Sequence, residues 1–163
     1  MGVRRPQAVG RAPATHRSDE ETRDLTQRDV RQRFERDPRE VSRARHMVGT
    51  ALRSWDMEAE LPAIELAVSE LVSNALCHGR GEVHVRLSAA RDRIRLEVAD
   101  GGGGRPTLQP PVPPDRAFGG WGLQFVDQLA DDWGTEAGDG RTLVWMVRRR
   151  RGPEDRLDGR DLP

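Results

Sequence analysis

Hydrophobic residues recur every three or four positions in two stretches of the chain, 41–52 and 64–75, and this spacing is typical of helices that bury one face. We expect the first helix to begin at Pro38 with Asp37 as its N-cap, because proline is tolerated at a first helical position. The second helix is predicted over 61–78. Its buried stripe comprises Ile64, Ala67, Val68, Leu71 and Ala75.

Alternating apolar and polar residues then predict strands at 83–88 and 94–99, joined by a hairpin loop at 89–93. The inward-facing positions of these two strands carry valine, leucine and isoleucine. A short mixed segment, 30–36, is predicted as an edge strand ahead of the first helix. These patterns place strands both before and after the helix pair.

The last part of the chain predicts a short helix over 122–131 and two strands, 133–137 and 142–148, around a turn at 138–140. A proline-rich stretch of roughly eighteen residues precedes this helix, and such long loops are usually functional or mobile. The order of elements predicts an α+β class: a two-layer sandwich with a mostly antiparallel, mixed sheet and helices on one face.

Charge divides the chain into three parts although its formal net charge is zero. All twenty-seven basic residues are arginine, and the two ends carry a surplus of them, whereas residues 37–147 hold five more acids than arginines. We expect disordered basic tails at 1–29 and 149–163 around one folded domain at 30–148. An acidic domain disfavours direct nucleic-acid binding.

Hydropathy and cysteine content narrow the class of protein further. Only 35% of the residues are hydrophobic and the mean hydropathy is −0.76, with no apolar stretch of membrane-spanning length. A single cysteine, Cys77, allows no internal disulfide. With no signal-peptide pattern at the start, we expect a cytoplasmic protein without membrane attachment.

Glu70, Asn74 and His78 stand four residues apart on the second predicted helix and so share one face of it. An asparagine can offer an uncharged oxygen to Mg²⁺, which takes few protein ligands beside phosphates and waters. A glutamate one turn away can orient or deprotonate a hydroxyl that attacks a terminal phosphate. The same spacing also fits a solvated polar face, and this motif alone leaves both interpretations open.

Asp100 and the glycines at 101–104 directly follow a predicted strand and match the pattern D-x-G-x-G. A carboxylate there can accept a hydrogen bond from an exocyclic amine such as that of adenine, and glycines let the backbone approach a flat ligand. The alternative is a flexible linker. A dinucleotide-binding fold is excluded because prolines follow where its helix should begin.

Two further segments hold candidate binding residues. The stretch Phe118–Leu123, FGGWGL, opens the short helix, and glycines at a helix N-terminus expose backbone N–H groups that suit a phosphate. Thr142, before the last strand, carries a hydroxyl that can join a polar contact near a base. Each segment is also compatible with ordinary turn composition.

The order of four motifs, SELVSNALCHG, VADGGGG, GGWGLQFVDQLADDWG and GRTLVW, resembles the GHKL ATPase family, which includes gyrases, heat-shock chaperones and histidine kinases. The resemblance covers residues 30–148 and is closest to the small ATP-binding anti-sigma factor serine/threonine kinases of actinomycetes. It implies a Bergerat fold, with ATP bound between the helices and the sheet.

The resemblance also implies roles for single residues. Glu70 falls on the catalytic glutamate and Asn74 on the asparagine that binds Mg²⁺. His78 and Gly79 fit the end of the asparagine motif without an assigned role. Asp100 falls on the adenine-contacting aspartate. Gly102 and Gly104 fall on the first glycine box, and Gly120 and Gly122 on the second. Thr142 matches the threonine of the closing strand.

The function implied by this family is an ATP- and Mg²⁺-dependent serine/threonine protein kinase. Its protein partners would be an anti-sigma factor antagonist that it phosphorylates, a sigma factor that it sequesters, or both. The resemblance and an exposed sheet face or edge also favour a homodimer. The alternative is a non-catalytic, nucleotide-sensing binding module; Glu70 argues against it, since such a module needs no base.

Overall fold

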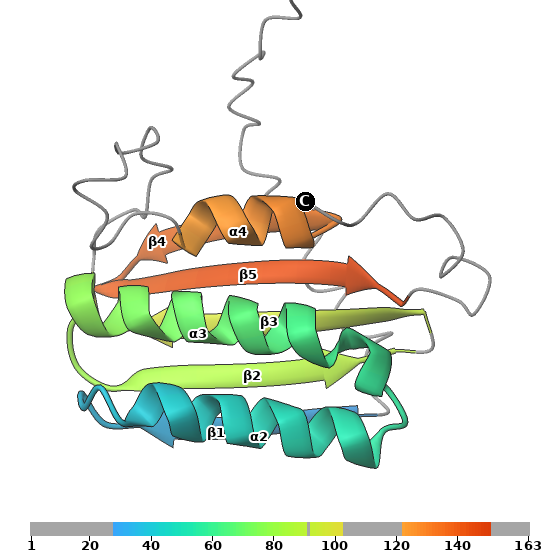
Figure 1. Ribbon diagram of the computed structural model, residues 1–163. Coiled ribbons are helices and arrows are strands. Elements are labelled where there is room, and N and C mark those ends of the chain that lie inside the picture. Colours follow the sequence, from blue (N-terminus) through green and yellow to red (C-terminus); the bar gives the residue numbers. More distant parts are fainter. Residues whose placement is uncertain (1–27, 91, 103–121, 151–163) are drawn as a thin grey trace, which may run out of the picture.

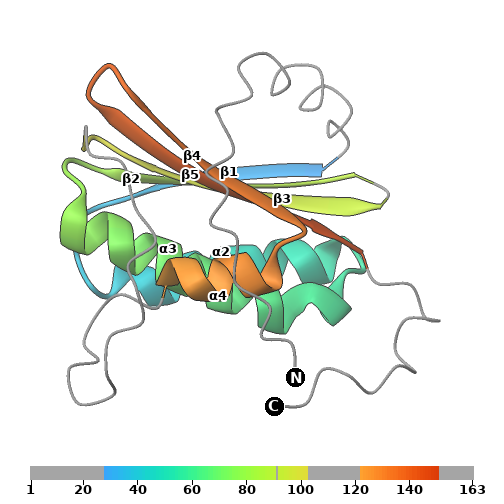
Figure 2. The ribbon, with the colours of Figure 1, turned by 90° about the horizontal axis from the view of Figure 1, so that it is seen from above.

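The computed structural model describes residues 28–90, 92–102 and 122–150, which form a sheet and a layer of helices (Figure 1). The sheet has the strand order β1-β2-β3-β5-β4, and α2, α3 and α4 all lie on one side of it (Figure 2). The α+β class with helices on one face is therefore confirmed. In chain order the elements are β1 (Arg28–Phe34), α2 (Glu40–Ser54), the 3-10 turn η1 (Glu58–Glu60), α3 (Leu61–His78), β2 (Val83–Ala89), β3 (Arg93–Asp100), α4 (Gly122–Leu129), β4 (Asp132–Gly138) and β5 (Arg141–Arg149).

The predicted mostly antiparallel sheet is confirmed, but every pairing between the described strands is antiparallel, so the sheet that they form is not mixed. The connections explain the difference. Two helices separate β1 from β2, and α4 with β4 separates β3 from β5. Because the chain reverses direction at each element, two intervening elements return it antiparallel to its neighbour, whereas a single crossover helix would have made the pair parallel.

The strands are displaced by one or two residues from their predicted bounds. The edge strand β1 begins at Arg28, inside the predicted tail, and ends at Phe34 rather than Arg36. Ala89 and Arg93 belong to β2 and β3, which shortens the hairpin loop. In the β4–β5 hairpin, Asp139 and Gly140 have φ values of 51° and 72°, which is typical of a type I′ turn.

The start of α2 differs from its prediction. The helix begins at Glu40, and Asp37 does not act as its N-cap. The Asp37 carboxylate instead accepts a hydrogen bond from the Arg39 N–H at 2.8 Å, and its carbonyl accepts one from the Glu40 N–H at 2.9 Å. Asp37 and Pro38 therefore form the turn that leads into the helix.

The bounds of α3 and the predicted buried stripe of that helix are confirmed. At its end, Gly79 is the C-cap with φ −81°, so it does not adopt the left-handed conformation that favours glycine. The Arg36 side chain donates hydrogen bonds to the carbonyls of Ala75 and Leu76 there. The guanidinium gives the Leu76 carbonyl a partner and is a second donor to the Ala75 carbonyl, which also accepts the Gly79 N–H; its charge complements the negative end of the helix dipole.

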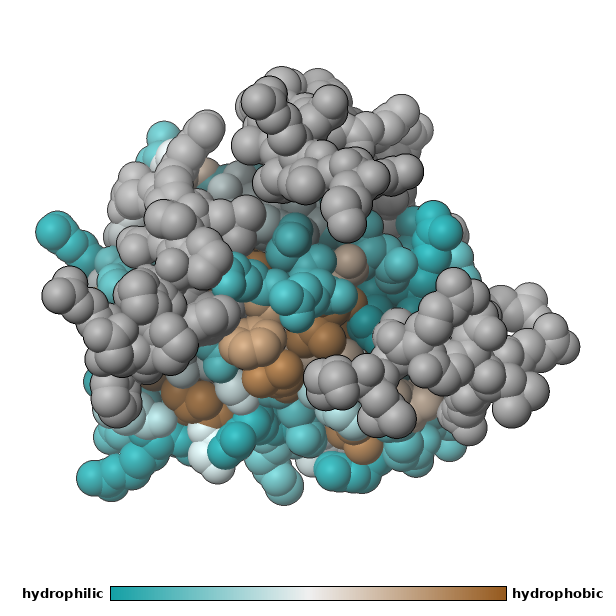
Figure 3. Space-filling model, turned by 45° about the horizontal axis from the view of Figure 1, so that its top comes forward, coloured by the Kyte–Doolittle hydropathy of each residue, from teal (hydrophilic) through white to brown (hydrophobic). Residues whose placement is uncertain are grey.

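The hydrophobic core fills the space between the two layers. On the sheet side it contains the predicted inward positions of β2 and β3, none more than 3% exposed, namely Val83, Val85, Leu87, Ile94, Leu96 and Val98. Leu123 and Val126 extend the core beneath α4, and Leu129 and Ala130 pack partly against it. Figure 3 also shows apolar surface among hydrophilic side chains on the molecule's exterior; Leu66, on α3, is the large hydrophobic residue exposed among those described.

A buried ion pair closes the end of the domain where α3 begins. The Arg148 guanidinium lies 2.7 Å from the Glu60 carboxylate, and their side chains are 13% and 3% exposed. Arg148 also donates a hydrogen bond to the carbonyl of Leu129 at the end of α4. This contact joins β5, η1 and α4. In the described part of the chain no helix is long and apolar enough to cross a membrane.

Candidate functional site

Glu70 and Asn74 lie one turn apart on α3, beside the apolar stripe that faces the sheet. Both side chains are half-buried. Among the described residues neither side chain has a hydrogen-bond or ion-pair partner. Burial raises the pKa of the Glu70 carboxyl above its usual value. A half-buried carboxylate and carboxamide with free polar atoms are suited to bind a ligand or a proton.

Asp100 ends β3, and its side chain is buried with 9% of its surface exposed. The oxygen Oδ1 accepts a hydrogen bond from the Gly102 N–H at 2.6 Å and a longer one from the Arg80 N–H at 3.4 Å. Within the described residues no donor contacts the second oxygen, Oδ2, and no cation pairs with this carboxylate. One carboxylate oxygen is thus held by the backbone while the other remains available.

Gly79 provides the space in which the Asp100 carboxylate lies. A Cβ atom on Gly79 would stand 2.4 Å from both Cγ and Oδ1 of Asp100 and 2.6 Å from the Ala75 carbonyl oxygen. Because φ −81° is open to any residue, glycine is required here for lack of room and not for backbone freedom. The sequence predicts no chemical role for Gly79, and the signal it offers is the position of this glycine directly after the asparagine motif.

Gly102 and Thr142 complete the polar cluster at the end of β3. A Cβ on Gly102 would lie 2.7 Å from Oδ1 of Asp100 and 3.2 Å from the Gly79 Cα. Thr142, which is 4% exposed and faces Asp100 in the β3–β5 pairing, donates its hydroxyl hydrogen to the Gly102 carbonyl. Gly102 is therefore fixed through both its N–H and its carbonyl, so three predicted site residues lie together.

The remaining predicted glycines lie around the segment 103–121. Gly122 is the first residue of α4, which begins at the end of the domain where α3 terminates (Figures 1 and 2). Gly104 and Gly120 lie outside the described residues, as do Arg105 and Arg116. The structure thus brings Asp100, Gly102 and Thr142 into contact with one another and places Gly122 at a helix N-terminus near the end of α3.

The donor set is compatible with a nucleotide and Mg²⁺. The Oδ2 oxygen of Asp100, which has no donor among the described residues, can accept a hydrogen bond from an exocyclic amine. No cluster of three His, Cys, Asp or Glu side chains in the described ranges could hold a metal alone. The half-buried Asn74 amide has no partner among the described residues, and its oxygen fits an ion that is held mainly by phosphates and waters. Two surface depressions lie elsewhere, one against β1 and α2 and one on the sheet.

Comparisons with known proteins identify the fold. The family model for the histidine kinase-like ATPase domain matches residues 34–148. A comparison with curated proteins returned no match. Among solved structures, the RsbU and RsbW domains of Rv1364c from Mycobacterium tuberculosis are similar, with 19% identity and a TM-score of 0.57. The match covers 76% of this chain and 33% of the other, so the chain spans about a third of that protein.

Proposed function

Because the chain belongs to the histidine kinase-like ATPase domain family, we propose that it binds ATP with Mg²⁺ and is a regulatory serine/threonine protein kinase of the anti-sigma factor type. The observation that carries the nucleotide part is the Asp100 carboxylate. It is buried, held through Oδ1 by backbone N–H groups, and leaves Oδ2 for a ligand's amine. Among the described residues Oδ2 is not a sealed, unpaired buried atom, so it reaches the surface, where a ligand can contact it.

Around this carboxylate, each predicted residue takes a part in nucleotide binding. Asp100 accepts a hydrogen bond from the adenine amine, and Thr142 keeps Gly102 in place beside the base. The glycines Gly104, Gly120 and Gly122 leave backbone N–H groups for the phosphates, aided by the positive end of the α4 dipole. Asn74 supplies an oxygen ligand to Mg²⁺, which neutralises phosphate charge when bound.

Glu70 is proposed as the group that accepts the proton of the attacking serine hydroxyl. As the oxygen of this hydroxyl bonds to the terminal phosphorus, its proton moves to Glu70 and ADP departs. Burial raises the pKa of Glu70, which makes it a stronger base once deprotonated. The transfer rate should therefore fall on acidification at a higher pH than an exposed glutamate would give, since only deprotonated Glu70 is active.

The RsbW domain in the solved neighbour supports a partner of the sigma-factor regulatory system. We propose an anti-sigma factor antagonist as the phosphorylated protein, with sequestration of a sigma factor as a second output. Residues 30–148 are proposed as the functional unit, in the cytoplasm and in a homodimer. Its described helices include none that could span a membrane.

The decisive experiment is calorimetric titration of the full chain with ATP and ADP, with and without Mg²⁺, followed by phosphotransfer from labelled ATP to candidate antagonists. Asn74→Ala should abolish the magnesium-dependent part of binding. Glu70→Gln should keep nucleotide binding and lower transfer by about a hundredfold or more. His78→Gln, one turn further along α3 and exposed, is the matched control and should change neither.

Two outcomes would contradict the proposal. If wild type binds no nucleotide, the ATP assignment is wrong. If nucleotide binds but no antagonist is phosphorylated, or if Glu70→Gln transfers phosphate at the wild-type rate, the kinase assignment or the role of Glu70 is wrong. If nucleotide binds but no antagonist is phosphorylated, the protein would be a nucleotide-sensing binding module.

A further inference from the structure

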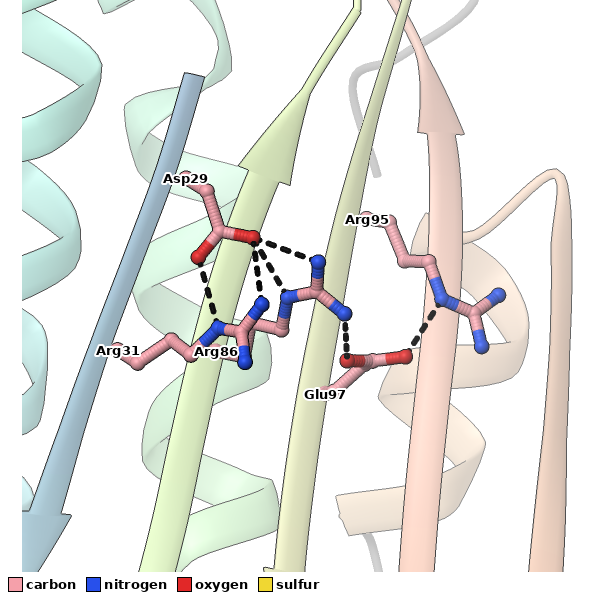
Figure 4. A network of polar contacts seen from close by, with 5 residues as sticks. All are labelled: Asp29, Arg31, Arg86, Arg95 and Glu97. Carbon is pink, nitrogen blue, oxygen red and sulfur yellow. Dashed lines mark hydrogen bonds and ion pairs between the residues drawn. The ribbon is translucent and has the colours of Figure 1, made fainter. Parts of the chain in front are cut away.

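The face of the sheet that points away from the helices carries a connected network of charged side chains (Figure 4). Arg86 lies 2.6 Å from Asp29 and 3.4 Å from Glu97, and Arg95 donates a hydrogen bond to Glu97 at 2.8 Å. Partial burial alone would raise the pKa of Asp29, but hydrogen bonds from Arg31 and Arg86 outweigh it and hold that pKa below its usual value. The carboxylates of this network are therefore charged and already occupied by arginines.

An aromatic contact fixes the middle of the same face. The Arg95 guanidinium lies 4.4 Å from the centre of the Trp145 ring. On its neighbouring strand Gly134 leaves room for this indole, because a Cβ there would stand 2.7 Å from the ring atom Cζ2. Arg95 and Trp145 are thus held in place and form a rigid border for whatever binds beside them.

Beside this border lies a depression of about 420 Å³ at the end of the sheet where β3 terminates. Its described walls are cationic, since Arg31, Arg33 and Arg141 are exposed and the carboxylate of Glu97 is paired. Ala99 and Leu143 supply apolar surface. Arg141 pairs with no acid among the described residues. The Arg33–Glu82 pair is exposed, so the attraction between its two charges is weak and Arg33 stays available to a ligand.

We propose that this depression binds an acidic, extended segment of a partner protein. Five arginines border it or its network (Arg31, Arg33, Arg86, Arg95 and Arg141) against three acids, Asp29, Glu82 and Glu97. Guanidinium groups bind carboxylates through two parallel hydrogen bonds. The apolar floor suits the alternate side chains of an extended peptide.

Segments of this chain are poorer occupants of the depression. A second copy facing it would bring the same excess of arginines against itself. Residues 1–27 contain five arginines and four acids, and residues 151–163 contain three arginines and four acids, so neither end is strongly acidic. Charge complementarity therefore favours an external acidic partner.

The test measures fluorescence anisotropy of a labelled peptide of four Glu-Val repeats with the full chain at low salt. The variant Arg33→Gln/Arg141→Gln removes two exposed cations from the depression. The control Arg45→Gln/Arg53→Gln removes two exposed cations from α2, so the net charge of the two variants is equal. We expect wild-type affinity in the control, at least tenfold weaker binding in the depression variant, and weaker binding as salt rises.

Three results would overturn the proposal. The first two are no binding of the peptide to wild type and equal affinity of the peptide for the two variants. The third is that wild type binds single-stranded DNA or phosphatidylserine vesicles more tightly than the peptide and that the depression variant loses this binding. A peptide of Gln-Val repeats should bind at least tenfold more weakly than the Glu-Val peptide. Circular dichroism of both variants checks that the fold is unchanged.

Discussion

Two carboxylates are buried at opposite ends of the domain. Their surroundings differ in a way that distinguishes a carboxylate that stabilises the fold from one that is available to a ligand. Glu60 is 2% exposed and Asp100 is 9% exposed. Glu60 contacts Arg148 near the end of β5, whereas Asp100 lies across from Thr142 near its start. Six residues of strand, on the order of 20 Å, separate these two positions of β5.

The difference lies in what compensates each charge. Glu60 is neutralised by a guanidinium that also joins β5 to α4, so the contact holds elements together. Asp100 receives only backbone N–H groups among the described residues, and its Oδ2 has no donor there. A buried carboxylate that is paired with an arginine has its charge compensated. A carboxylate that is held by the backbone through one oxygen can still accept a hydrogen bond from a ligand through the other.

The largest expected effect is on stability at the Glu60 end. Arg148→Met keeps most of the side-chain volume but removes the charge that compensates a buried carboxylate, so we expect a loss of about 3 kcal/mol in the free energy of unfolding. Urea denaturation measures it. Nucleotide affinity of the folded variant should equal that of wild type. A loss below about 1 kcal/mol would show that Glu60 and Arg148 act as an ordinary surface pair.

At the Asp100 end the expected effect is on binding. Asp100→Asn can keep the acceptor for the Gly102 N–H but places an amide donor where Oδ2 is proposed to accept a hydrogen bond from the adenine amine. We expect ATP affinity to fall by about ten- to a hundredfold, in line with a lost hydrogen bond to a charged group, while the urea midpoint changes little. Unchanged ATP affinity would mean that Asp100 is a structural residue like Glu60.

A smaller effect tests whether Gly79 acts through Asp100. Gly79→Ala should displace the carboxylate and weaken ATP binding by about tenfold, with a cost of about 1–3 kcal/mol in stability from overpacking. Gly138→Ala is the matched control, because no atom lies within 4 Å of its Cβ position. In an Asp100→Ala background Gly79→Ala should cost little further affinity; additive losses would refute the coupling.

Much of the fold was predictable because it depends on local periodicity. The stripe of α3 and the alternation in β2 and β3 identify their buried faces without knowledge of any partner. Element ends were less accurate. Because Asp37 forms a turn, α2 begins at Glu40 and not at Pro38. Because Arg28 pairs with β2, β1 begins earlier than predicted. Both boundaries depend on contacts that hydrophobic periodicity does not describe.

The candidate site remains a prediction in its residue types, and its assembly was not predictable from the sequence. The order of the motifs places Glu70, Asn74, Asp100 and Thr142, and the structure adds that Asp100, Gly102 and Thr142 touch. The role of Gly79 was missed, because the need for glycine there comes from a carboxylate twenty-one positions later in the chain. No local pattern reveals a contact of that range.

The sequence by itself determined the class of fold, the buried faces and the chemical types of the candidate site, because each follows from residue identity and short-range spacing. Only the tertiary structure decided which buried carboxylate is compensated and which retains a free oxygen. It also decided that Arg31, Arg86 and Arg95, from three strands, gather on the open side of the sheet. These properties depend on strand register and on distances between segments far apart in the chain, which hydropathy does not encode.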